Sequence, residues 1–280
     1  MSDRPRAAND EVRRARGAGR GIGAFNVVLL EHAEAIVAGA ERAGLPVVVQ
    51  ISQNCVEYHG AFEPIGRATI ALARRASVPV VVHLDHAQDA ELVREAVATG
   101  VDSVMFDGSR LPYEENVAAT RAVVDYCHER GVVVEAELGE VGGKDGVHAP
   151  GARTDPAEAA AFVAATAVDS LAVAVGTSHA MVERVAEVDT RLVSALAAAL
   201  DVPLVLHGSS GLPDEALAGA VRAGITKVNV ATHLNVLFTR AVRDVLEGPR
   251  PPVDPRRYVA AGRAAVTDEV QRLLGLLAGR

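Results

Sequence analysis

Three histidines stand just after short apolar runs of the sequence, at His86, His179 and His207. Neutral imidazole rings are common ligands of zinc and other divalent ions, and three such ligands leave a coordination position open for a substrate. Their spacing along the chain is no motif by itself, because each histidine follows a different run. The three residues therefore predict a catalytic metal site only if the fold brings the ends of these runs together.

Carboxylate side chains also stand within or at the ends of apolar runs. Asp85 and Asp107 stand at the ends of two apolar runs, and Glu135 and Glu137 share one face of a third, because side chains alternate along a strand. Buried carboxylates need a metal or a counter-charge. Lys227, at the start of another run, could supply that charge.

Two lysines are present in the whole chain, Lys144 and Lys227. A Schiff-base enzyme would have to use one of them, so metal chemistry is favoured. His83 lies two residues before Asp85 on the same face and is interpreted as a hydrogen-bonded structural residue. Of the other histidines, His148 alone could be carried into a site by a loop.

Small residues follow two further runs, at positions where barrel enzymes hold phosphate through backbone N–H groups and a helix N-terminus. Glycine and serine let the backbone approach an anion closely. Together with two polar residues at other run ends, they form the predicted substrate-binding set: Asn26, Ser52, Gly208, Ser209, Ser210, Asn229, Val230, Ala231 and Thr232.

The runs that carry these residues alternate with Ala-rich helical stretches, which is typical of parallel strands joined by crossover helices. Eight such units in 280 residues predict an α/β fold, a closed (β/α)8 TIM barrel, whose usual size is roughly 250 residues. The active face of such a barrel lies at the C-terminal ends of its strands. The predicted strands are 22–26, 47–52, 80–84, 103–107, 132–138, 170–175, 204–207 and 227–230.

Two segments do not fit the repeat. Residues 139–156, rich in glycine and proline, are expected to form a mobile active-site loop. Residues 256–278 read as an extra C-terminal helix that packs on the barrel or on a second subunit. We expect one domain over residues 1–280.

The composition excludes several classes of protein. With 28 basic and 36 acidic residues the formal charge is −8, and the basic residues are dispersed, which argues against nucleic-acid binding. The isolated Cys55 and Cys127 favour a reducing compartment, the cytoplasm. No apolar run reaches the roughly 18 residues of a membrane span, and the charged N-terminus resembles no secretion signal. We expect no membrane partner.

Six blocks, in this order, resemble the class II, metal-dependent ketose-bisphosphate aldolases, the fructose- and tagatose-bisphosphate aldolase family. They are HLDHAQD (83–89), FDGSRLPYEENV (106–117), VEAELGEVGG (134–143), DSLAVAVGTSH (169–179), VPLVLHGSSG (202–211) and KVNVAT (227–232). AFNV near the start and DPRRYV before the last helix extend the likeness to nearly the whole chain.

The resemblance implies roles for the metal-site residues. Asp85 matches the catalytic acid/base of the family. The zinc ligands would be His86, His179 and His207. Asp107 and Glu137 match carboxylates that hold an alternative or second metal position.

The resemblance also implies how a substrate is bound. Gly208 and Ser210 match the turn that grips the phosphate of dihydroxyacetone phosphate, while Asn229 and Thr232 match contacts to the enediolate and the same phosphate. A monovalent cation, Na⁺ or K⁺, near this phosphate and a homodimer or homotetramer are further expectations.

Cleavage of the C3–C4 bond of a ketose bisphosphate requires stabilisation of an enediolate, which zinc provides as a Lewis acid on the C2 and C3 oxygens. By the same resemblance, Asp85 is expected to take the proton of the C4 hydroxyl. A glutamate of the mobile loop protonates C3 in the family, but here Lys144-Asp145 replaces two adjacent glutamates. Asp145, one methylene shorter, is the candidate, with Glu140 or an unassigned group as alternatives.

Further departures from the family pattern leave the identity of the ketose substrate open. Ala180 and Gln53-Asn54 stand where glycine is common in the family. The predicted substrate is fructose 1,6-bisphosphate, with tagatose 1,6-bisphosphate or another phosphorylated ketose as the alternative. A metal-dependent barrel isomerase or hydrolase, and a catalytically silent barrel that acts as a binding protein, are the alternatives from other classes.

Overall fold

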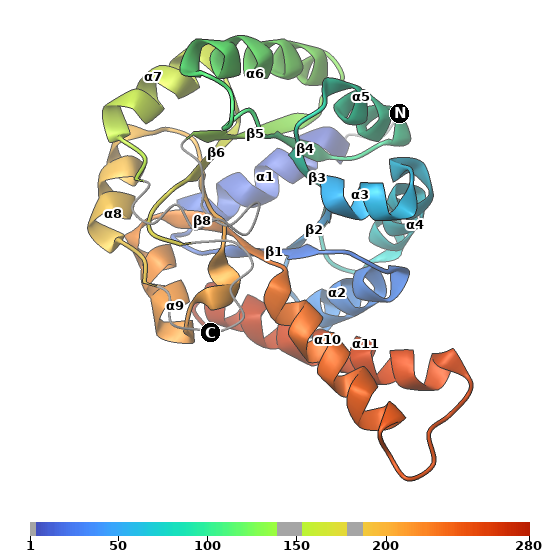
Figure 1. The fold of residues 1–280 in the computed structure, drawn as a ribbon. Coiled ribbons are helices and arrows are strands. Elements are labelled where there is room, and N and C mark those ends of the chain that lie inside the picture. Colours follow the sequence, from blue (N-terminus) through green and yellow to red (C-terminus); the bar gives the residue numbers. More distant parts are fainter. Residues whose placement is uncertain (1–3, 139–152, 178–186) are drawn as a thin grey trace.

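The computed structural model describes residues 4–138, 153–177 and 187–280, with side chains from Glu11 onward. Eight parallel strands close into a barrel in chain order, and β8 pairs with β1 (Figure 1). The predicted (β/α)8 TIM barrel is confirmed. The strands are β1 (Ile22–Asn26), β2 (Val47–Ser52), β3 (Val80–Ala87), β4 (Ser103–Phe106), β5 (Val133–Leu138), β6 (Ser170–Val173), β7 (Leu204–Leu206) and β8 (Ile225–Val230).

The strand bounds differ from the predicted ones at several ends. β3 continues to Ala87, beyond the predicted end at 84, because an irregular pairing with β4 carries it further. β6 ends at Val173, since its last pair with β7 joins Ala172 to Val205. β8 begins two residues before Lys227, at Ile225.

Helices surround the barrel (Figure 1). Several begin at an aspartate whose side chain accepts a hydrogen bond from the first-turn backbone, as Asp89, Asp155 and Asp254 do. The helices are α1 (Arg4–Gly17), α2 (Leu30–Ala43), α3 (Gln53–His59), α4 (Phe62–Arg75), α5 (Ala90–Thr99), α6 (Tyr113–His128), α7 (Pro156–Thr166), α8 (Thr190–Ala199), α9 (Asp214–Ala223), α10 (Thr232–Leu246) and α11 (Pro255–Leu277), with a 3₁₀ turn, η1, over Ser209–Gly211.

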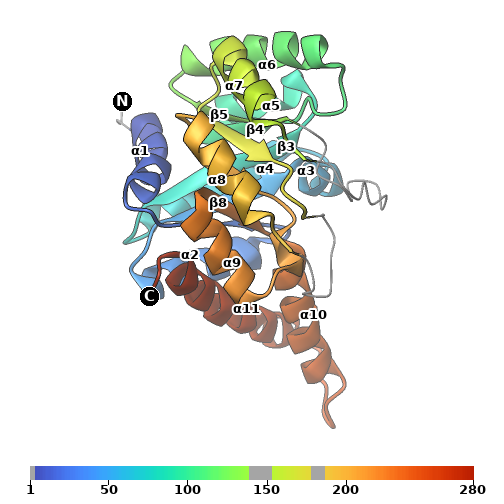
Figure 2. The same cartoon turned by 90° about the vertical axis from the view of Figure 1, so that its left-hand side faces the viewer.

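Helix α1 closes the N-terminal end of the barrel, and the sequence pattern did not predict it. Val12 and Ala15 pack on the inward-facing Ile22 and Val48. Figure 2 places α1 at one end of the barrel and α3 toward the other. The open end of the barrel is therefore the C-terminal one, where functional side chains are expected.

Helix α11 occupies the predicted extension and packs along α2 and α10. The α10–α11 hairpin projects from the barrel (Figures 1 and 2). Most of the predicted loop over 139–156 lies outside the described residues. Within the described ranges, no helix combines the length and the apolar character that a membrane span requires.

Candidate active site

The C-terminal end of the barrel contains a cavity of about 400 Å³. Glu137 and His207 are fully buried beside it. His179 and Asp145 lie outside the described residues, together with the loop alternative Glu140. The cavity is lined by these predicted site residues: Asn26, Ser52, Asp85, His86, Asp107, Gly208, Ser210, Asn229, Ala231 and Thr232.

Two consecutive residues of β3 reach this cavity, although side chains of a regular strand alternate between faces. Asp85 belongs to the inward face, like His83. The pairing register of β3 and β4 shifts between Leu84 and Ala87, and His86 has a φ of 52°, a left-handed conformation that is uncommon outside glycine. This irregularity brings the His86 side chain to the same cavity as Asp85. Such backbone strain clusters at functional positions.

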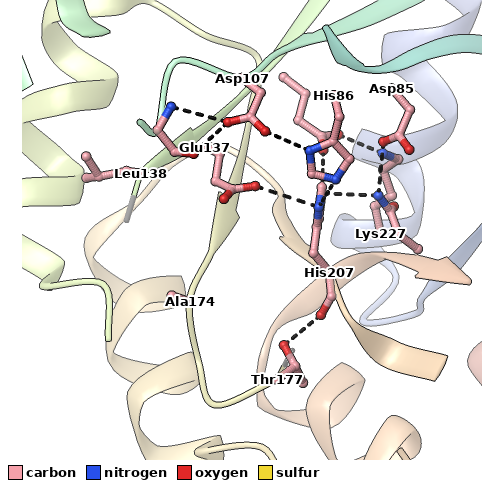
Figure 3. A network of polar contacts seen from close by, with 12 residues as sticks. Asp85, His86, Asp107, Glu137, Leu138, Ala174, Thr177, His207 and Lys227 are labelled. Carbon is pink, nitrogen blue, oxygen red and sulfur yellow. Dashed lines mark hydrogen bonds and ion pairs between the residues drawn. The ribbon is translucent and has the colours of Figure 1, made fainter. Parts of the chain in front are cut away.

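The imidazole rings of His86 and His207 are in contact and nearly perpendicular, with an interplanar angle of 84° (Figure 3). Nδ1 of His86 lies 2.8 Å from Oδ2 of Asp107, and Nε2 of His207 lies 3.1 Å from Oε1 of Glu135. An ionised carboxylate only accepts hydrogen bonds, so each of these nitrogens carries the N–H of its ring. The other two nitrogens, 2.9 Å apart, then direct lone pairs at each other. A proton or a metal ion bound by these two nitrogens would remove the repulsion between their lone pairs. The two rings therefore fit a metal site.

Carboxylates complete two overlapping sets of metal-ligating atoms. The ligand atoms of His86, Asp107 and Glu137 lie within 4.8 Å of one another, as do those of Asp85, His86 and His207. Burial by itself lowers the pKa of His86, but the carboxylates of Asp85, Asp107 and Glu137 outweigh it and raise this pKa. The position therefore favours positive charge. Mixed imidazole and carboxylate donors suit zinc and similar divalent ions.

Neutral amides surround the carboxylate of Asp85. Asn26 Nδ2 donates to Oδ2 over 2.9 Å, and Gln50 Nε2 lies 3.4 Å from the same oxygen and 2.7 Å from Asn26 Oδ1. Asn229 Nδ2 lies 3.5 Å from Oδ1. The sequence reasoning missed Gln50. Its signal was a polar residue inside VVVQIS, two residues before Ser52 and so on the same face.

Deeper in the barrel, Lys227 Nζ lies 2.8 Å from Glu135 Oε2, and both side chains are buried. Lys227 is thus the counter-charge that strand alternation predicted. His83 Nδ1 lies 2.7 Å from Ser103 Oγ. Burial, and then the charge of Lys227, hold the pKa of His83 well below its ordinary value. His83 is therefore a neutral, hydrogen-bonded ring, in line with the structural interpretation.

The turn after β7 faces the start of α10. Gly208 has a φ of 68°, which favours glycine, and Ser210 Oγ accepts from the backbone N–H groups of Ala231 (3.4 Å) and His233 (3.2 Å). Helix α10 begins at Thr232, so its N-terminal end borders the cavity. A helix N-terminus favours negative charge, and this wall of the cavity fits an anionic group.

Two residues of the predicted substrate-binding set, Ser209 and Val230, are buried and do not line the cavity. Ser209 is buried, and its hydroxyl donates to the Asn229 carbonyl. Val230 is also buried, in the hydrophobic core.

The cavity lining also contains Gln53, one of the departures from the family pattern, and Arg110, which the sequence reasoning missed. Gln53 Oε1 accepts from the Gln88 backbone N–H over 2.9 Å, and Gln53 Nε2 donates to Glu57 Oε1 over 3.0 Å. A glycine at this position would lack both contacts. Arg110, after β4, adds a positive charge to the lining. Its basic side chain three residues beyond Asp107 was the available signal.

A TIM barrel whose C-terminal mouth combines a metal-fitting cluster, an aspartate and an anion-fitting turn defines a metal-dependent barrel enzyme for an anionic substrate. The family model described as "Fructose-bisphosphate aldolase class-II" matches residues 7–279. The chain belongs to the class II fructose-bisphosphate aldolase family. Membership of this class makes the chain an aldolase, a lyase, and implies a divalent metal.

Individual relatives agree with this assignment. A fructose-bisphosphate aldolase of Staphylococcus aureus strain Mu50 is 37% identical over 257 residues, which cover 90% of each chain. The crystal structure of the YdjI aldolase from Escherichia coli K12 has 32% identity and a TM-score of 0.85, with 96% of this chain and 95% of that chain covered. Fructose-bisphosphate aldolase from Campylobacter jejuni, at 23% identity and a TM-score of 0.77 over 96% and 93% of the chains, supports the fold alone.

Proposed function

We propose that this chain is a zinc-dependent aldolase that reversibly cleaves fructose 1,6-bisphosphate to dihydroxyacetone phosphate and glyceraldehyde 3-phosphate. The observation that carries the proposal is one cavity lined by Asp85, His86 and the anion-fitting turn at Ser210, with the buried ring of His207 in contact with His86. Proton removal, charge stabilisation and phosphate binding are the requirements of this cleavage.

The metal would be held by His86 and His207, with His179 as the ligand implied by the family resemblance, and by Asp107 or Glu137 at an alternative position. When bound, a divalent ion supplies Lewis-acid stabilisation of the negative charge that develops beside the ketone.

Asp85 accepts the proton of the C4 hydroxyl as the C3–C4 bond breaks. C4 then becomes the aldehyde carbon, and the bonding electron pair stays with the C3 fragment as an enediolate. The amides of Asn26 and Gln50 keep the carboxylate in position. On the other wall, the α10 N-terminus and the turn around Gly208 bind a substrate phosphate. Fixing the phosphate orients the C4 hydroxyl toward Asp85.

The proton that C3 then requires comes from Asp145 in this proposal, with Glu140 as the alternative. Asp145→Ala should slow exchange of the proton at the carbon of dihydroxyacetone phosphate that becomes C3, by about 10²-fold or more. Exchange followed by NMR in D₂O measures this rate, and Glu140→Ala is the matched control. Parent-like exchange in Asp145→Ala would transfer the role to another group.

Several wider features belong to the same proposal. A monovalent cation, Na⁺ or K⁺, binds near the phosphate turn. Residues 1–280 form one domain that includes the active-site loop predicted over 139–156. The protein works in the cytoplasm, without nucleic acid or membrane partners, as a homodimer or homotetramer.

A coupled assay on metal-quantified protein tests the substrate. We expect turnover of fructose 1,6-bisphosphate to exceed that of tagatose 1,6-bisphosphate, its C4 epimer, in kcat/KM. A preference for the tagatose compound would retain the aldol chemistry and reassign the substrate. No cleavage of either compound by zinc-loaded protein would overturn the proposed function.

A further inference from the structure

We propose that the buried Lys227–Glu135 pair is a positioning device that selects the tautomer of His207 and so directs its Nδ1 lone pair at the metal. The inference rests on the metal site of the proposed function. Neither residue belongs to the ligand sets described above, and both lie deeper in the barrel.

The three side chains come from different strands and form a continuous chain of contacts. Lys227 of β8 lies 2.8 Å from Oε2 of Glu135, on β5, and the other oxygen of this carboxylate lies 3.1 Å from Nε2 of His207, which follows β7. Lys227 and Glu135 are 3% and 2% exposed, and His207 is fully buried. Water therefore competes little with these contacts, so the protein itself decides which nitrogen of His207 carries the proton.

Two groups compete for Nε2 of His207. Glu135 can only accept a hydrogen bond, which requires a proton on Nε2 and leaves the lone pair on Nδ1. The amide nitrogen of Asn229, 3.1 Å from the same Nε2, can donate and favours the opposite tautomer. A hydrogen bond to an ionised partner is roughly twice as strong as one between neutral groups. The negative charge of Glu135 therefore decides the competition.

The selected nitrogen faces the cluster. Nδ1 of His207 lies 2.9 Å from Nε2 of His86 and 3.8 Å from Oε2 of Glu137. Lys227 compensates the buried charge of Glu135 and occupies one carboxylate oxygen, which leaves the other for His207. Such outer contacts orient metal-ligating histidines and raise their basicity.

Glu135→Gln tests the device with almost no change in shape. The ammonium of Lys227 has only donors and should take the amide oxygen, which turns the NH₂ group toward Nε2 of His207. Nε2 must then accept, and the proton moves to Nδ1. We expect Zn²⁺ to bind 10–100-fold more weakly, about the effect of losing such a partner.

A second substitution distinguishes tautomer selection from a loss of packing. In Glu135→Gln with Lys227→Met, the amide is free to turn its oxygen to His207, so Zn²⁺ affinity should recover by about tenfold. Glu135→Leu with Lys227→Met also lacks both charges but cannot accept a hydrogen bond, and should bind Zn²⁺ as weakly as Glu135→Gln. In Glu135→Gln the buried Lys227 has lost its counter-charge, which can destabilise the fold. The two charge-free variants have no buried lysine, so their Zn²⁺ affinities can be compared even in that case.

The measurement is a competition titration of Zn²⁺ alone against a chromophoric chelator, with full-length protein first stripped of metal and checked for folding by thermal unfolding. Ser103→Ala removes a buried hydrogen bond to His83 in the same barrel and should bind Zn²⁺ like the parent. Equal affinity in the two charge-free variants, or parent-like affinity in Glu135→Gln, would overturn the inference. Failure of the parent itself to bind Zn²⁺ would instead overturn the proposed metal site.

Discussion

Asp85 and His86 are neighbours in the sequence and still share one cavity. At the scale of single residues, this depends on the left-handed backbone of His86, because regular alternation would send its ring to the outside of β3. The same irregularity brings Asp85, the proposed acid/base, next to His86, a proposed metal ligand. A proton acceptor and a charge-stabilising centre must both contact one small substrate, so their adjacency is itself functional.

Asp85→Asn separates the two roles. The amide keeps the shape of the carboxylate but cannot take the C4 proton, so we expect kcat to fall by about 10²–10⁴-fold. Zn²⁺ content should stay at the parent level, because His86 and His207 are intact. Steady-state kinetics on metal-quantified protein check both outcomes. A variant that loses its zinc together with its activity would identify Asp85 as a ligand instead.

At the scale of elements, α11 joins the barrel through close contacts with α2 and α10. Gly39 lies where α2 meets α11, and Gly262 of α11 lies against the ring of Phe238 on α10. These small residues let the helices approach closely. Helix α10, whose N-terminal end borders the cavity, is thereby connected to the packing of the C-terminal helix.

Gly39→Ala should loosen this contact. A Cβ at Gly39 would meet the Thr267 carbonyl oxygen and Val270 at 2.8 Å, so we expect a loss of about 1–3 kcal/mol in the free energy of unfolding. Gly275→Ala, in α11 with nothing within 4 Å of the added atom, is the control and should gain about 0.5–1 kcal/mol from helix propensity. Urea denaturation measures both. Equal stability of the two variants would contradict the close packing.

An ion-pair network connects α10 and α11 with α9. Glu269 of α11 contacts His233 of α10 and Arg272, and Arg272 contacts Asp214 of α9. Burial would raise the pKa of Glu269, but hydrogen bonds from Arg272 and His233 outweigh it and lower this pKa to about 2 from 4.5. A carboxyl group whose pKa is lower in the folded state than in the unfolded chain stabilises the fold at pH values above its unfolded-state pKa. This contribution is lost as the pH falls through the folded-state pKa.

Glu269→Gln should therefore cost about 1–3 kcal/mol of unfolding free energy at pH 7. The difference from the parent should shrink between pH 4.5 and pH 2, where Glu269 becomes protonated in the folded parent. Urea titrations at pH 7 and pH 3 measure it. Glu34→Gln breaks an exposed pair with Arg263 and should cost at most about 1 kcal/mol. A cost for Glu269→Gln that does not depend on pH would exclude this electrostatic origin.

At the scale of the whole molecule, the barrel interior near α1 is apolar on one side and charged on the other. Ile22 and Val48 pack with Val12 of α1, while Lys227, the register partner of Ile22, is paired with Glu135 in a small pocket that Val12 also lines. The metal-fitting cluster lies at the opposite, C-terminal end of the barrel. The carboxylates around His86 favour positive charge at this end of the barrel, so a bound cation would stabilise the folded protein.

Chelation by EDTA should abolish cleavage and lower the melting temperature, and added Zn²⁺ should restore both, because the ion binds the folded state. Borohydride with substrate should leave the enzyme active, because no Schiff base forms. Activity assays, thermal unfolding and mass spectrometry check these outcomes. A reduced substrate adduct on Lys144 or Lys227 would contradict the metal mechanism.

The sequence by itself determined the barrel and most of the residues at its mouth. Val-rich runs alternating with helical stretches repeat eight times, and the polar residues near the ends of these runs are local features of the sequence. Strand alternation also identified Glu135 and Lys227 as inward-facing, and the structure pairs them. Such predictions succeed because strand periodicity depends on neighbours along the chain.

Only the tertiary structure decided how these residues meet. Gln50 joins Asp85, and α1 closes the barrel, through contacts between segments far apart in sequence. The direction of His86 depends on a register shift between β3 and β4, and the proton on His207 depends on a carboxylate from β5. Registers and hydrogen-bond partners are set when strands pair across the barrel, and the order of residues along one strand does not contain that information.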